Sequence, residues 1–597
     1  MKRQWFIAGI ATTIVMGMAT GCSSGNSTSN SNNGTQTPTG SQGSAASDAK
    51  DTFSMSFIDD GHGFDPGLFS WEMYQDGVGI FEGLVHTGPN GKPTAGIATS
   101  WESSKNNTVW TFHLRKDAKF TNGDPVTAQS FVYAMQRAVS PTLSVATKAA
   151  SVPLGDVPIL NMMDVRTGAK PASALGVKAP DDYTVEITLD RPDANMLQDI
   201  CLPTSDWMVP LDQKVVENMK PSDWTNPSKI VSDGPYMLKT YKAATEGTLV
   251  PNPNYYTKVT MKKINLFYGN SQTLDQLVAF KNGSLDAGLI QPEQVAAAQN
   301  DSSLKSQLNM WDTSAQYSYV PLPSKNTALQ NKNIRLAFEM AIDKNAICQG
   351  VLKGTASPAY GYFTPNWLDP WMADNKVDYN VDKAKQLLAN AGYPDGKGFP
   401  TVIILVGSTT DHVAEAIQQM WEQNLGVKVQ LQAEEWGQFV TDMKKQLPAN
   451  EVGWLNSSTN AKYPQQMLPT TPSSWLINHT DLAKGYMNPS AYSGWLKIDN
   501  NQDLDAAKKE NQEYPIFQQN LPKDYLDTLN LGVEAYQKQD DSLMKQYFTQ
   551  MEQNAYTIPI YTPKQPILLR KDVQGYYPNK FLLIDPPVWL NYITKSN

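Results

Sequence analysis

The chain has 597 residues, of which 40% are hydrophobic and 18% are charged, a composition typical of globular proteins with more than one lobe. The formal net charge of −9, with no basic patch that contains interleaved aromatic residues, argues against a nucleic-acid binder. Three cysteines in a chain of this length exclude a disulfide scaffold.

The N-terminus has the pattern of a secretory signal. Lys2 and Arg3 precede a mostly apolar segment, residues 5–19, which is too short to span a bilayer comfortably. Small residues then lead to Cys22 in a pattern that resembles a bacterial lipobox, with Ala19 at the position where leucine is usual. We expect a signal peptide over residues 1–21 and a lipid on Cys22. The alternative is ordinary secretion that leaves an incidental free thiol.

A polar linker follows the cysteine. Residues 22–50 consist mainly of Ser, Asn, Thr and Gly and contain almost no apolar side chains. Such a segment cannot bury enough surface to offset the entropy of ordering it. A flexible coil of about 27 residues averages roughly 30 Å from end to end. The sequence therefore predicts a lipid anchor followed by a flexible linker.

The first globular part alternates in the manner of antiparallel strands. Trp110, Phe112 and Leu114 fall on one face of a predicted strand, and residues 183–189 alternate in the same way. Between these strands, "TNGDP" predicts a turn at residues 121–125. A helix is predicted next, with an N-terminal cap and apolar residues at helical spacing: Thr127, Phe131, Ala134, Met135 and Ala138.

A strand–helix–strand pattern appears later in the chain. Residues 401–407 are apolar throughout, as expected for a strand covered on both faces. Asp411 can cap the helix that follows, Gly426 ends it, and residues 427–432 form the next predicted strand. This unit implies parallel strands with a right-handed crossover. The fold class is therefore α/β, with a more antiparallel part near residues 90–200.

Several ordered segments resemble one family. "GLVHTGPNGKPTAGIATSWE" and "VWTFHLRKDAKFTNGDPVTAQSFVYAMQR" are similar to segments of the oligopeptide-binding proteins, which are extracytoplasmic solute-binding lipoproteins of ABC importers in the large peptide- and nickel-binding family. The resemblance continues through "IVSDGPYMLKTY", "QLVAFKNGSLDAG", "NLGVKVQLQAEEWGQF" and "TIPIYTP". It spans nearly the whole chain after the linker.

The resemblance implies a three-lobed fold like that of periplasmic binding proteins. Two hinged α/β lobes, lobes I and III, would close over the ligand, and lobe II would be a smaller inserted lobe. The implied boundaries are 51–81, 230–313 and 562–597 for lobe I, 82–229 for lobe II and 314–561 for lobe III.

The resemblance also implies a ligand site. Peptide-binding relatives pair the main chain of an extended ligand with their own main chain, which gives affinity with little sequence preference. The family's ligand strand matches Gly453, Trp454 and Leu455 here, Trp436 matches a tryptophan of the pocket wall, and Tyr561 can donate a hydroxyl. The alternative for both tryptophans is that they pack in the core.

One expected residue is missing. Peptide-binding relatives place an aspartate after the Gly-Trp pair to bind the α-ammonium of the ligand, and here the position falls on Ser457, or on Asn460 when counted back from "PQQML". We therefore include Asn460 among the ligand-binding residues. Either another carboxylate binds the amine or the ligand is not a peptide with a free amine. The carboxylates considered are Glu72, Glu434, Glu435 and Glu451.

These observations predict a binding protein and not an enzyme. We expect a monomeric receptor, lipid-anchored at the outer face of the cytoplasmic membrane, that captures oligopeptides and delivers them to an ABC permease and its ATPase subunits. No cofactor, metal or nucleic-acid partner is expected, and the five histidines show no metal-ligand spacing. The alternatives are an oligosaccharide receptor on the same fold, a peptide pheromone sensor and, last, an extracellular hydrolase.

Overall fold

The structure, a computed structural model, describes most of the chain that follows the linker. The chain divides into two units, residues 1–45 and 46–597. The predicted signal peptide, Cys22 and nearly all of the linker lie outside the described residues. The described residues are 50–57, 63–68, 79–89, 91–143, 157–166, 168–190, 192–201, 203–220, 223–243, 245–268, 274–322, 324–362, 376–407, 411–435, 438–439, 442, 445–460, 523–538, 540–577 and 590–596.

A four-stranded antiparallel sheet confirms the predicted alternation. Its order is β4-β5-β7-β6, and β5 (Val109–Leu114) buries Trp110, Phe112 and Leu114. The predicted helix is α3 (Ala128–Val139), and most of its buried apolar residues share one hydrophobic core with this sheet, whereas Ala134 packs in the core of the second sheet. The neighbouring elements are β2 (Val85–Thr87), β3 (Pro93–Ala95), β4 (Ala98–Ser103), α5 (Met162–Arg166), β6 (Val177–Asp181), β7 (Thr184–Thr188), α6 (Met196–Ile200) and α7 (Gln213–Glu217).

A second sheet joins distant parts of the chain. In its order β1-β10-β9-β8, β1 (Thr52–Phe57) runs parallel to β10 (Lys263–Tyr268). The core of this sheet also takes in five buried residues of the segment predicted as lobe II, so part of that segment packs with the elements predicted as lobe I. The five residues are Ala134, Val209, Leu211, Val216 and Trp224. The remaining strands are β8 (Tyr236–Lys242) and β9 (Glu246–Pro251).

The largest sheet contains the predicted strand–helix–strand unit. Its order is β11-β18-β13-β17-β15-β16, and β12 and β14 pair with β18 off this path. The unit is confirmed as β15 (Thr401–Val406), α14 (His412–Leu425) and β16 (Val429–Ala433), with the two strands parallel. The other strands of the sheet are β11 (Ala287–Leu289), β12 (Leu308–Asp312), β13 (Ala315–Pro321), β14 (Ala356–Pro358), β17 (Glu451–Asn460) and β18 (Ile558–Leu569).

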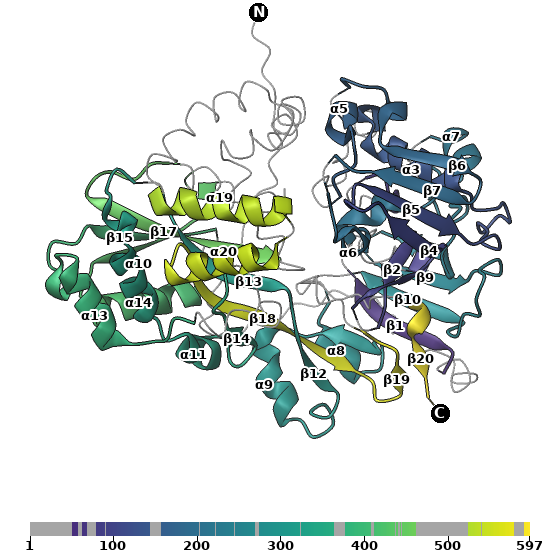
Figure 1. Cartoon of the computed structure of the whole chain (residues 1–597). Coiled ribbons are helices and arrows are strands. Elements are labelled where there is room, and N and C mark those ends of the chain that lie inside the picture. The colour runs from purple at the N-terminus through teal and green to yellow at the C-terminus, as the bar shows by residue number, and fades with distance from the viewer. Residues whose placement is uncertain are drawn as a thin grey trace, which may run out of the picture. The chain divides into compact units, whose positions relative to one another are not determined.

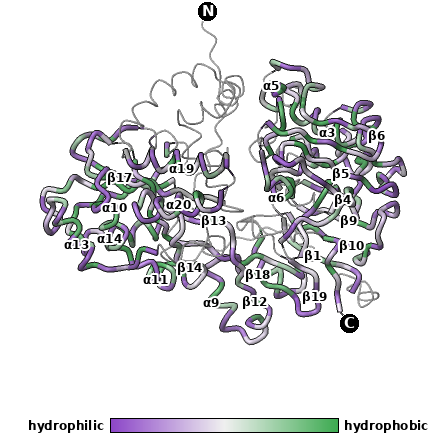
Figure 2. The backbone as a smooth tube through the Cα atoms, viewed as in Figure 1, coloured by the Kyte–Doolittle hydropathy of each residue, from purple (hydrophilic) through white to green (hydrophobic). Residues whose placement is uncertain are grey.

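Both ends of α14 form as the sequence predicts. The Asp411 carboxylate accepts a hydrogen bond from the Ala414 N–H at 2.9 Å. Gly426 ends the helix with a φ of +69°, a left-handed conformation that suits glycine. Figure 2 shows both hydrophobic and hydrophilic residues along this helix, as its amphipathic role requires.

Helices cover the two faces of this sheet. Ile404 and Trp454 belong to a core shared with α10, α13 and α14, whereas Leu405 and Leu455 belong to a core shared with α19 and α20. This division follows from the strand period, because consecutive residues point to opposite faces. Figure 1 shows α19 and α20 side by side. The helices are α10 (Lys332–Met340), α13 (Val381–Asn390), α19 (Lys523–Lys538) and α20 (Asp541–Gln553).

The strand β18 continues through the predicted boundary between lobes III and I. It has 12 residues and pairs with β11, β12, β13 and β14, so position 561/562 falls inside one continuous strand. The lobe boundaries themselves stay predictions. The remaining elements are α8 (Gln276–Lys281), α9 (Pro292–Asn300), α11 (Lys344–Ala346), β19 (Val573–Gln574) and β20 (Thr594–Lys595).

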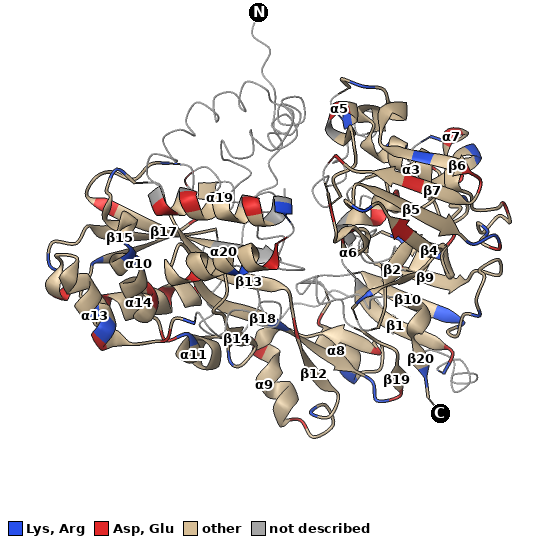
Figure 3. Cartoon of the chain, viewed as in Figure 1, with Lys and Arg blue, Asp and Glu red and all other residues tan. Residues whose placement is uncertain are grey.

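Among the described residues, no helix is both long enough and apolar enough to cross a membrane. Figure 3 shows acidic and basic residues on the same helices, for example along α13 and α19.

Candidate functional site

The predicted ligand strand is a central strand of the large sheet. Gly453, Trp454 and Leu455 lie on β17, which pairs with β13 on one side and with β15 on the other. A Cβ atom at Gly453 would lie 2.7 Å from Leu447 Cδ1 and 2.8 Å from Leu322 Cδ1. The glycine therefore makes room for the protein's own side chains, and both backbone edges of this segment already have strand partners.

The Trp454 side chain lies in the core, which is the alternative that the sequence left open. Its exposed fraction is 0%, and its ring centroid lies 6.0 Å from that of Phe338 and 6.2 Å from that of Trp421. Its indole Nε1 is buried without a hydrogen-bond partner among the described residues. Leu455 is also buried, on the opposite face of the sheet.

The other predicted site residues are described in part. Trp436 lies outside the described residues, and Asn460 ends β17 with a side chain that is not described. Tyr561 is described on β18, where its ring stacks on Tyr317 with centroids 4.6 Å apart and an interplanar angle of 11°. Tyr317 of β13 in turn pairs with Ser458 of β17. Tyr561 therefore lies across one strand from the second half of β17.

That second half of β17 has one backbone edge without a described strand partner. Pairing with β13 continues to Ala315↔Asn460, whereas pairing with β15 ends at Leu405↔Leu455. The segment 456–460 thus extends past the carboxyl end of β15, and its row of backbone N–H and C=O groups on that edge has no strand partner in the part of the chain that the structure describes. Among the described residues, this is where the large sheet can accept an extended chain beside β17.

A carboxylate that we did not predict as a site residue lies beside this segment. Asp411 accepts a hydrogen bond from Asn456 Nδ2 at 3.0 Å, in addition to the one from the Ala414 N–H. Asn456 is the register partner of Tyr319, so both belong to one face of the sheet. The sequence identified Asp411 as a helix cap, and only the strand register could have shown that it also faces β17.

The tyrosines near Asp411 form a polar and aromatic cluster. Burial raises the pKa of the hydroxyls of Tyr317, Tyr319 and Tyr561. The next cause is the charge of Asp411 for Tyr317 and Tyr319, whereas for Tyr561 it is Tyr317 and then Asp411. Tyr319 is 1% exposed, and its hydroxyl has no hydrogen-bond partner among the described residues. We call Tyr317, Tyr319, Asp411, Asn456 and Tyr561 the tyrosine–carboxylate cluster.

The topology of the sheet places this cluster where open α/β sheets bind ligands. From β15 the chain crosses through α14 to β16 on one side, and β17 returns to the other side of β15. Ligands bind outside the carboxyl ends of strands at such a switch point. Asp411 follows the carboxyl end of β15 at the N-terminus of α14.

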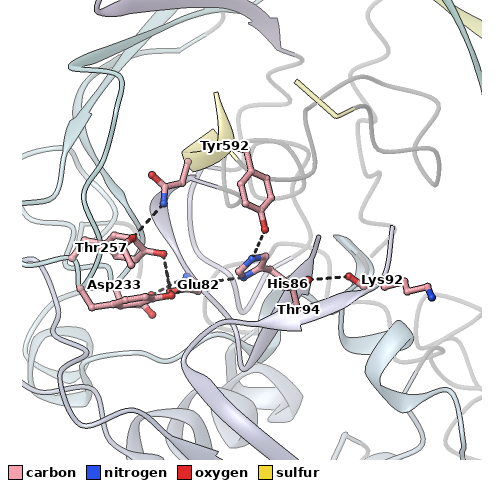
Figure 4. A network of polar contacts seen from close by, with 10 residues as sticks. Glu82, His86, Lys92, Thr94, Asp233, Thr257 and Tyr592 are labelled. Carbon is pink, nitrogen blue, oxygen red and sulfur yellow. Dashed lines mark hydrogen bonds and ion pairs between the residues drawn. The ribbon is translucent and has the colours of Figure 1, made fainter. Parts of the chain in front are cut away.

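A second polar network, shown in Figure 4, surrounds Glu82. The Glu82 carboxylate accepts hydrogen bonds from Tyr255 (3.2 Å) and Tyr256 (2.8 Å), and His86 Nδ1 lies 3.4 Å from Glu82 Oε1. The backbone N–H of Glu82 donates to Asp233 Oδ1 at 3.1 Å. Burial, followed by repulsion from Glu82, raises the pKa of Asp233 well above its usual range.

This network joins distant segments of the chain. His86 Nε2 lies 3.0 Å from the Tyr592 hydroxyl near the C-terminus. Gly234 donates its N–H to the Ile80 carbonyl, and a Cβ atom at Gly234 would lie 2.5 Å from that carbonyl. Glu82 and Asp233 stand next to the predicted start and end of lobe II. We interpret the network as a structural link between the two crossing segments, because its hydrogen bonds join residues of both, while Asp233 Oδ2 is buried without a partner among the described residues.

The described residues contain no group of three or more histidine, cysteine, aspartate or glutamate side chains that could hold a metal ion. Cys201 and Cys348 are free thiols, and burial raises the pKa of each to about 12. Neither is therefore a reactive thiolate at neutral pH.

The carboxylates considered for binding an amine differ in position. Glu451 begins β17, six residues before Ser457 and so about 20 Å away along the strand. Glu434 accepts a hydrogen bond from Gln432 Nε2 at 2.5 Å, and Glu435 is exposed. Glu72 lies outside the described residues. Of the carboxylates discussed, Asp411 is the one that accepts a hydrogen bond from the segment 456–460 of β17, through Asn456.

Comparison with known proteins gives the class and then the family. The model for "Bacterial extracellular solute-binding proteins, family 5 Middle" matches residues 92–474. The chain is thus a solute-binding protein, and it belongs to family 5 of the bacterial extracellular solute-binding proteins. The resemblance stated from the sequence is confirmed.

Individual relatives agree with this family. The chain is 30% identical over 426 residues to the periplasmic oligopeptide-binding protein OppA of Escherichia coli (strain K12), covering 69% of this chain and 74% of the relative. It is 29% identical over 514 residues to OppA of Haemophilus influenzae (strain ATCC 51907 / DSM 11121 / KW20 / Rd), covering 83% and 85%.

Solved structures confirm the α/β fold class. The structure of MppA, the periplasmic murein tripeptide-binding protein, in its unliganded open form has a TM-score of 0.67 to this chain at 24% identity, covering 92% of this chain and 97% of MppA. OppA of Burkholderia pseudomallei has a TM-score of 0.59 at 22% identity, covering 92% and 99%.

Proposed function

We propose that the chain is a lipid-anchored receptor that captures extended oligopeptides outside the cytoplasm and delivers them to an ABC permease and its ATPase subunits. The observation that carries this proposal is the edge of residues 456–460, which has no strand partner among the described residues and lies beside the tyrosine–carboxylate cluster. The relatives named as oligopeptide-binding proteins support the choice of ligand.

A peptide suits this edge because its backbone repeats the groups that a strand needs. Each ligand residue presents an N–H and a C=O to the edge, whatever its side chain. Five residues of an extended chain span about 16 Å, which equals the length of the segment 456–460. An oligosaccharide lacks this repeating pattern of donors and acceptors, so the edge favours a peptide.

The proposed contacts differ from the ligand strand that the sequence alone suggested. Because both edges of 453–455 are paired within the sheet, we assign the backbone contacts to 456–460, which ends at Asn460. Tyr561 lines the same region through its stack on Tyr317. Trp436 stays a proposed pocket residue.

The rest of the proposal concerns how capture becomes transport. A lipid on Cys22 and the linker 22–50 would hold the receptor near its permease as a monomer. Lobes I and III, with the boundaries given above, would close on the peptide, and permease subunits would open them again using ATP. Capture requires only reversible binding, and no cofactor or catalytic group takes part.

The ligand carried through purification tests this function. We expect a mass spectrum of the protein purified from its own cells, denatured to release what it holds, to contain peptides of mixed sequence. A single peptide species would support the pheromone sensor instead. A sugar would overturn the peptide proposal, and turnover of an added peptide would show a hydrolase.

A further inference from the structure

The charge of Asp411 has no cationic partner in the part of the chain that the structure describes. Its carboxylate accepts from two neutral donors, the Ala414 N–H at 2.9 Å and Asn456 Nδ2 at 3.0 Å. No described lysine or arginine forms an ion pair with it, and the adjacent His412 pairs with Glu415 at 3.0 Å. A carboxylate has about four acceptor positions, so Asp411 can accept further hydrogen bonds.

The helix that follows presents its N-terminus to the Asp411 carboxylate. α14 has 14 residues, and its N-terminus carries a partial positive charge next to the carboxylate. The N–H groups of that first turn are neutral, so they stabilise the negative charge without removing it. A half-buried anion in this position favours a cation from outside the protein.

A second, independent observation comes from the hydroxyl of Tyr319. This side chain is 1% exposed, and the hydroxyl has no hydrogen-bond partner among the described residues. Tyr319 is the register partner of Asn456, which donates to Asp411, and it lies two residues from Tyr317 on the same face of β13. A buried hydroxyl without a hydrogen-bond partner is unfavourable, and a bound ligand with polar hydrogens would supply the missing hydrogen bond.

The stacked rings add an aromatic surface for a cation. Tyr317 and Tyr561 lie 4.6 Å apart between centroids, and both are half-buried. The face of an aromatic ring attracts an ammonium group, more strongly when water is partly excluded. Carboxylate, hydroxyl and ring face together match a primary ammonium, which has three N–H donors and no acceptor.

The place of the cluster along β17 fits the end of a peptide. Asn456, which holds Asp411, is the first residue of the segment 456–460, so an extended ligand along this edge has one end beside Asp411. We propose that Asp411, with Tyr317, Tyr319 and Tyr561, binds a primary ammonium group of the ligand. The inference rests on the proposed function, and it names the residue that replaces the expected aspartate after the Gly-Trp pair.

Calorimetry with three pentapeptides on the mature full-length protein tests the site. The probes are penta-alanine, N-acetyl-penta-alanine and N-acetyl-Lys-tetra-alanine. The variant is Asp411→Asn, which removes the charge but keeps a good helix cap. The control is Asp540→Asn, because Asp540 caps α20 in the same way, accepting from Ser542 and Leu543.

We expect acetylation to weaken the binding of penta-alanine to the wild-type protein by at least about tenfold, a change of about 1.4 kcal/mol. Asp411→Asn should weaken the binding of penta-alanine by a similar factor and leave the affinity for N-acetyl-penta-alanine unchanged. Asp540→Asn should bind both peptides as the wild-type protein does. If N-acetyl-Lys-tetra-alanine binds the wild-type protein as tightly as penta-alanine does, and loses this affinity in Asp411→Asn, the site accepts any primary ammonium. If N-acetyl-Lys-tetra-alanine binds the wild-type protein as weakly as N-acetyl-penta-alanine does, the site is specific for the α-ammonium.

An equal effect of acetylation on wild type and Asp411→Asn would overturn the inference while leaving peptide capture intact. A wild-type protein that binds none of the three peptides would instead count against the proposed function, which the mass spectrum of carried ligand tests separately. The thermal midpoint of Asp411→Asn should lie within a few degrees of wild type, so that loss of binding is not loss of folding.

Discussion

Two buried tryptophans in the core between the large sheet and its helices, Trp421 of α14 and Trp454 of β17, differ in one hydrogen bond. Trp421 Nε1 donates to the Phe338 carbonyl at 2.9 Å, whereas Trp454 Nε1 has no partner among the described residues. Both side chains are 0% exposed, and both contact Phe338. Trp454 therefore stabilises the protein through packing, and Trp421 through packing and a hydrogen bond.

We expect Trp454→Phe to lower the free energy of unfolding less than Trp421→Phe does. Trp421→Phe should cost about 1–3 kcal/mol more, because it leaves the Phe338 carbonyl unsatisfied. Trp454→Ala should cost about 3–5 kcal/mol by opening a cavity. Urea denaturation measures these values, and calorimetry of Trp454→Phe should show nearly unchanged peptide affinity. A stable Trp454→Phe protein that no longer binds peptide would show that the indole contacts the ligand.

Asp233 should make stability depend on pH. Its pKa is raised by burial and then by Glu82, so the folded protein keeps the proton that the unfolded chain loses above about pH 4. The contribution of Asp233 to the free energy of unfolding is fully present below the pKa that Asp233 has in the unfolded chain. This contribution is lost as the pH rises toward the pKa that Asp233 has in the folded protein. Asp233→Asn does not titrate, so its stability relative to wild type should increase by about 1.4 kcal/mol per pH unit over that range.

Urea denaturation of both proteins from pH 4 to pH 8 gives this difference directly, because the remaining groups titrate in both. A difference that does not change with pH would mean that Asp233 keeps its ordinary pKa.

At the level of secondary structure, the sequence predicted the features that depend on residues close together along the chain. The limits of β5 and α14 follow from alternation, helical spacing and caps, which are local. The role of Gly453 does not, because a glycine permits close approach without showing what approaches. Only the folded structure shows that the protein's own Leu322 and Leu447 fill that space. Asp411 was likewise predicted as a cap, and its contact with Asn456 depends on residues far along the chain.

The C-terminus of α14 offers a matched test of helix termination. Gly426 and Gly392 both have positive φ, +69° and +97°. A Cβ atom at Gly426 would lie 2.5 Å from the Asp395 carbonyl oxygen, whereas nothing lies within 4 Å of one at Gly392. Gly392→Ala should cost about 1–2 kcal/mol for the left-handed backbone alone. Gly426→Ala should cost clearly more, because a backbone atom must also move.

Thermal or urea denaturation of the two variants provides the comparison. Equal losses of stability would show that the loop containing Asp395 moves away at little cost.

At the scale of the whole molecule, the sheets join segments that no local pattern connects. β1 pairs with β10, and β18 pairs with β12 and β13 from much earlier in the chain. Hydrophobic periodicity predicts a strand but not its partner, so the assembly of distant segments was predictable only through the family resemblance. The site depends on the same assembly, since its five residues come from β13, β17, β18 and the start of α14.

The proposed anchor also acts on the whole molecule. Cys22→Ser should move the protein from the membrane fraction to the soluble fraction, because the acyl chains supply about 0.8 kcal/mol per buried CH₂. Cys201→Ser is the control, since burial raises the pKa of that thiol to about 12 and leaves it unreactive. Fractionation of the producing cells measures the outcome. Membrane association that survives Cys22→Ser would contradict lipidation at this residue.

Ligand binding should stabilise the whole protein by an amount that depends on the site and not on overall stability. At a penta-alanine concentration of 100 times the dissociation constant, binding adds about 2.7 kcal/mol to the free energy of unfolding. Gly426→Ala should gain this full increment at the wild-type concentration of peptide, because Gly426 and Asp411 stand at opposite ends of a 14-residue helix, about 21 Å apart. Asp411→Asn should gain about 1.4 kcal/mol less, since its dissociation constant is about tenfold higher. Urea denaturation with and without peptide measures the three increments. Gly426→Ala could instead lose as much of the peptide-induced rise in the free energy of unfolding as Asp411→Asn does. In that case peptide binding depends on the overall stability of the protein, and Asp411 has no specific role in binding.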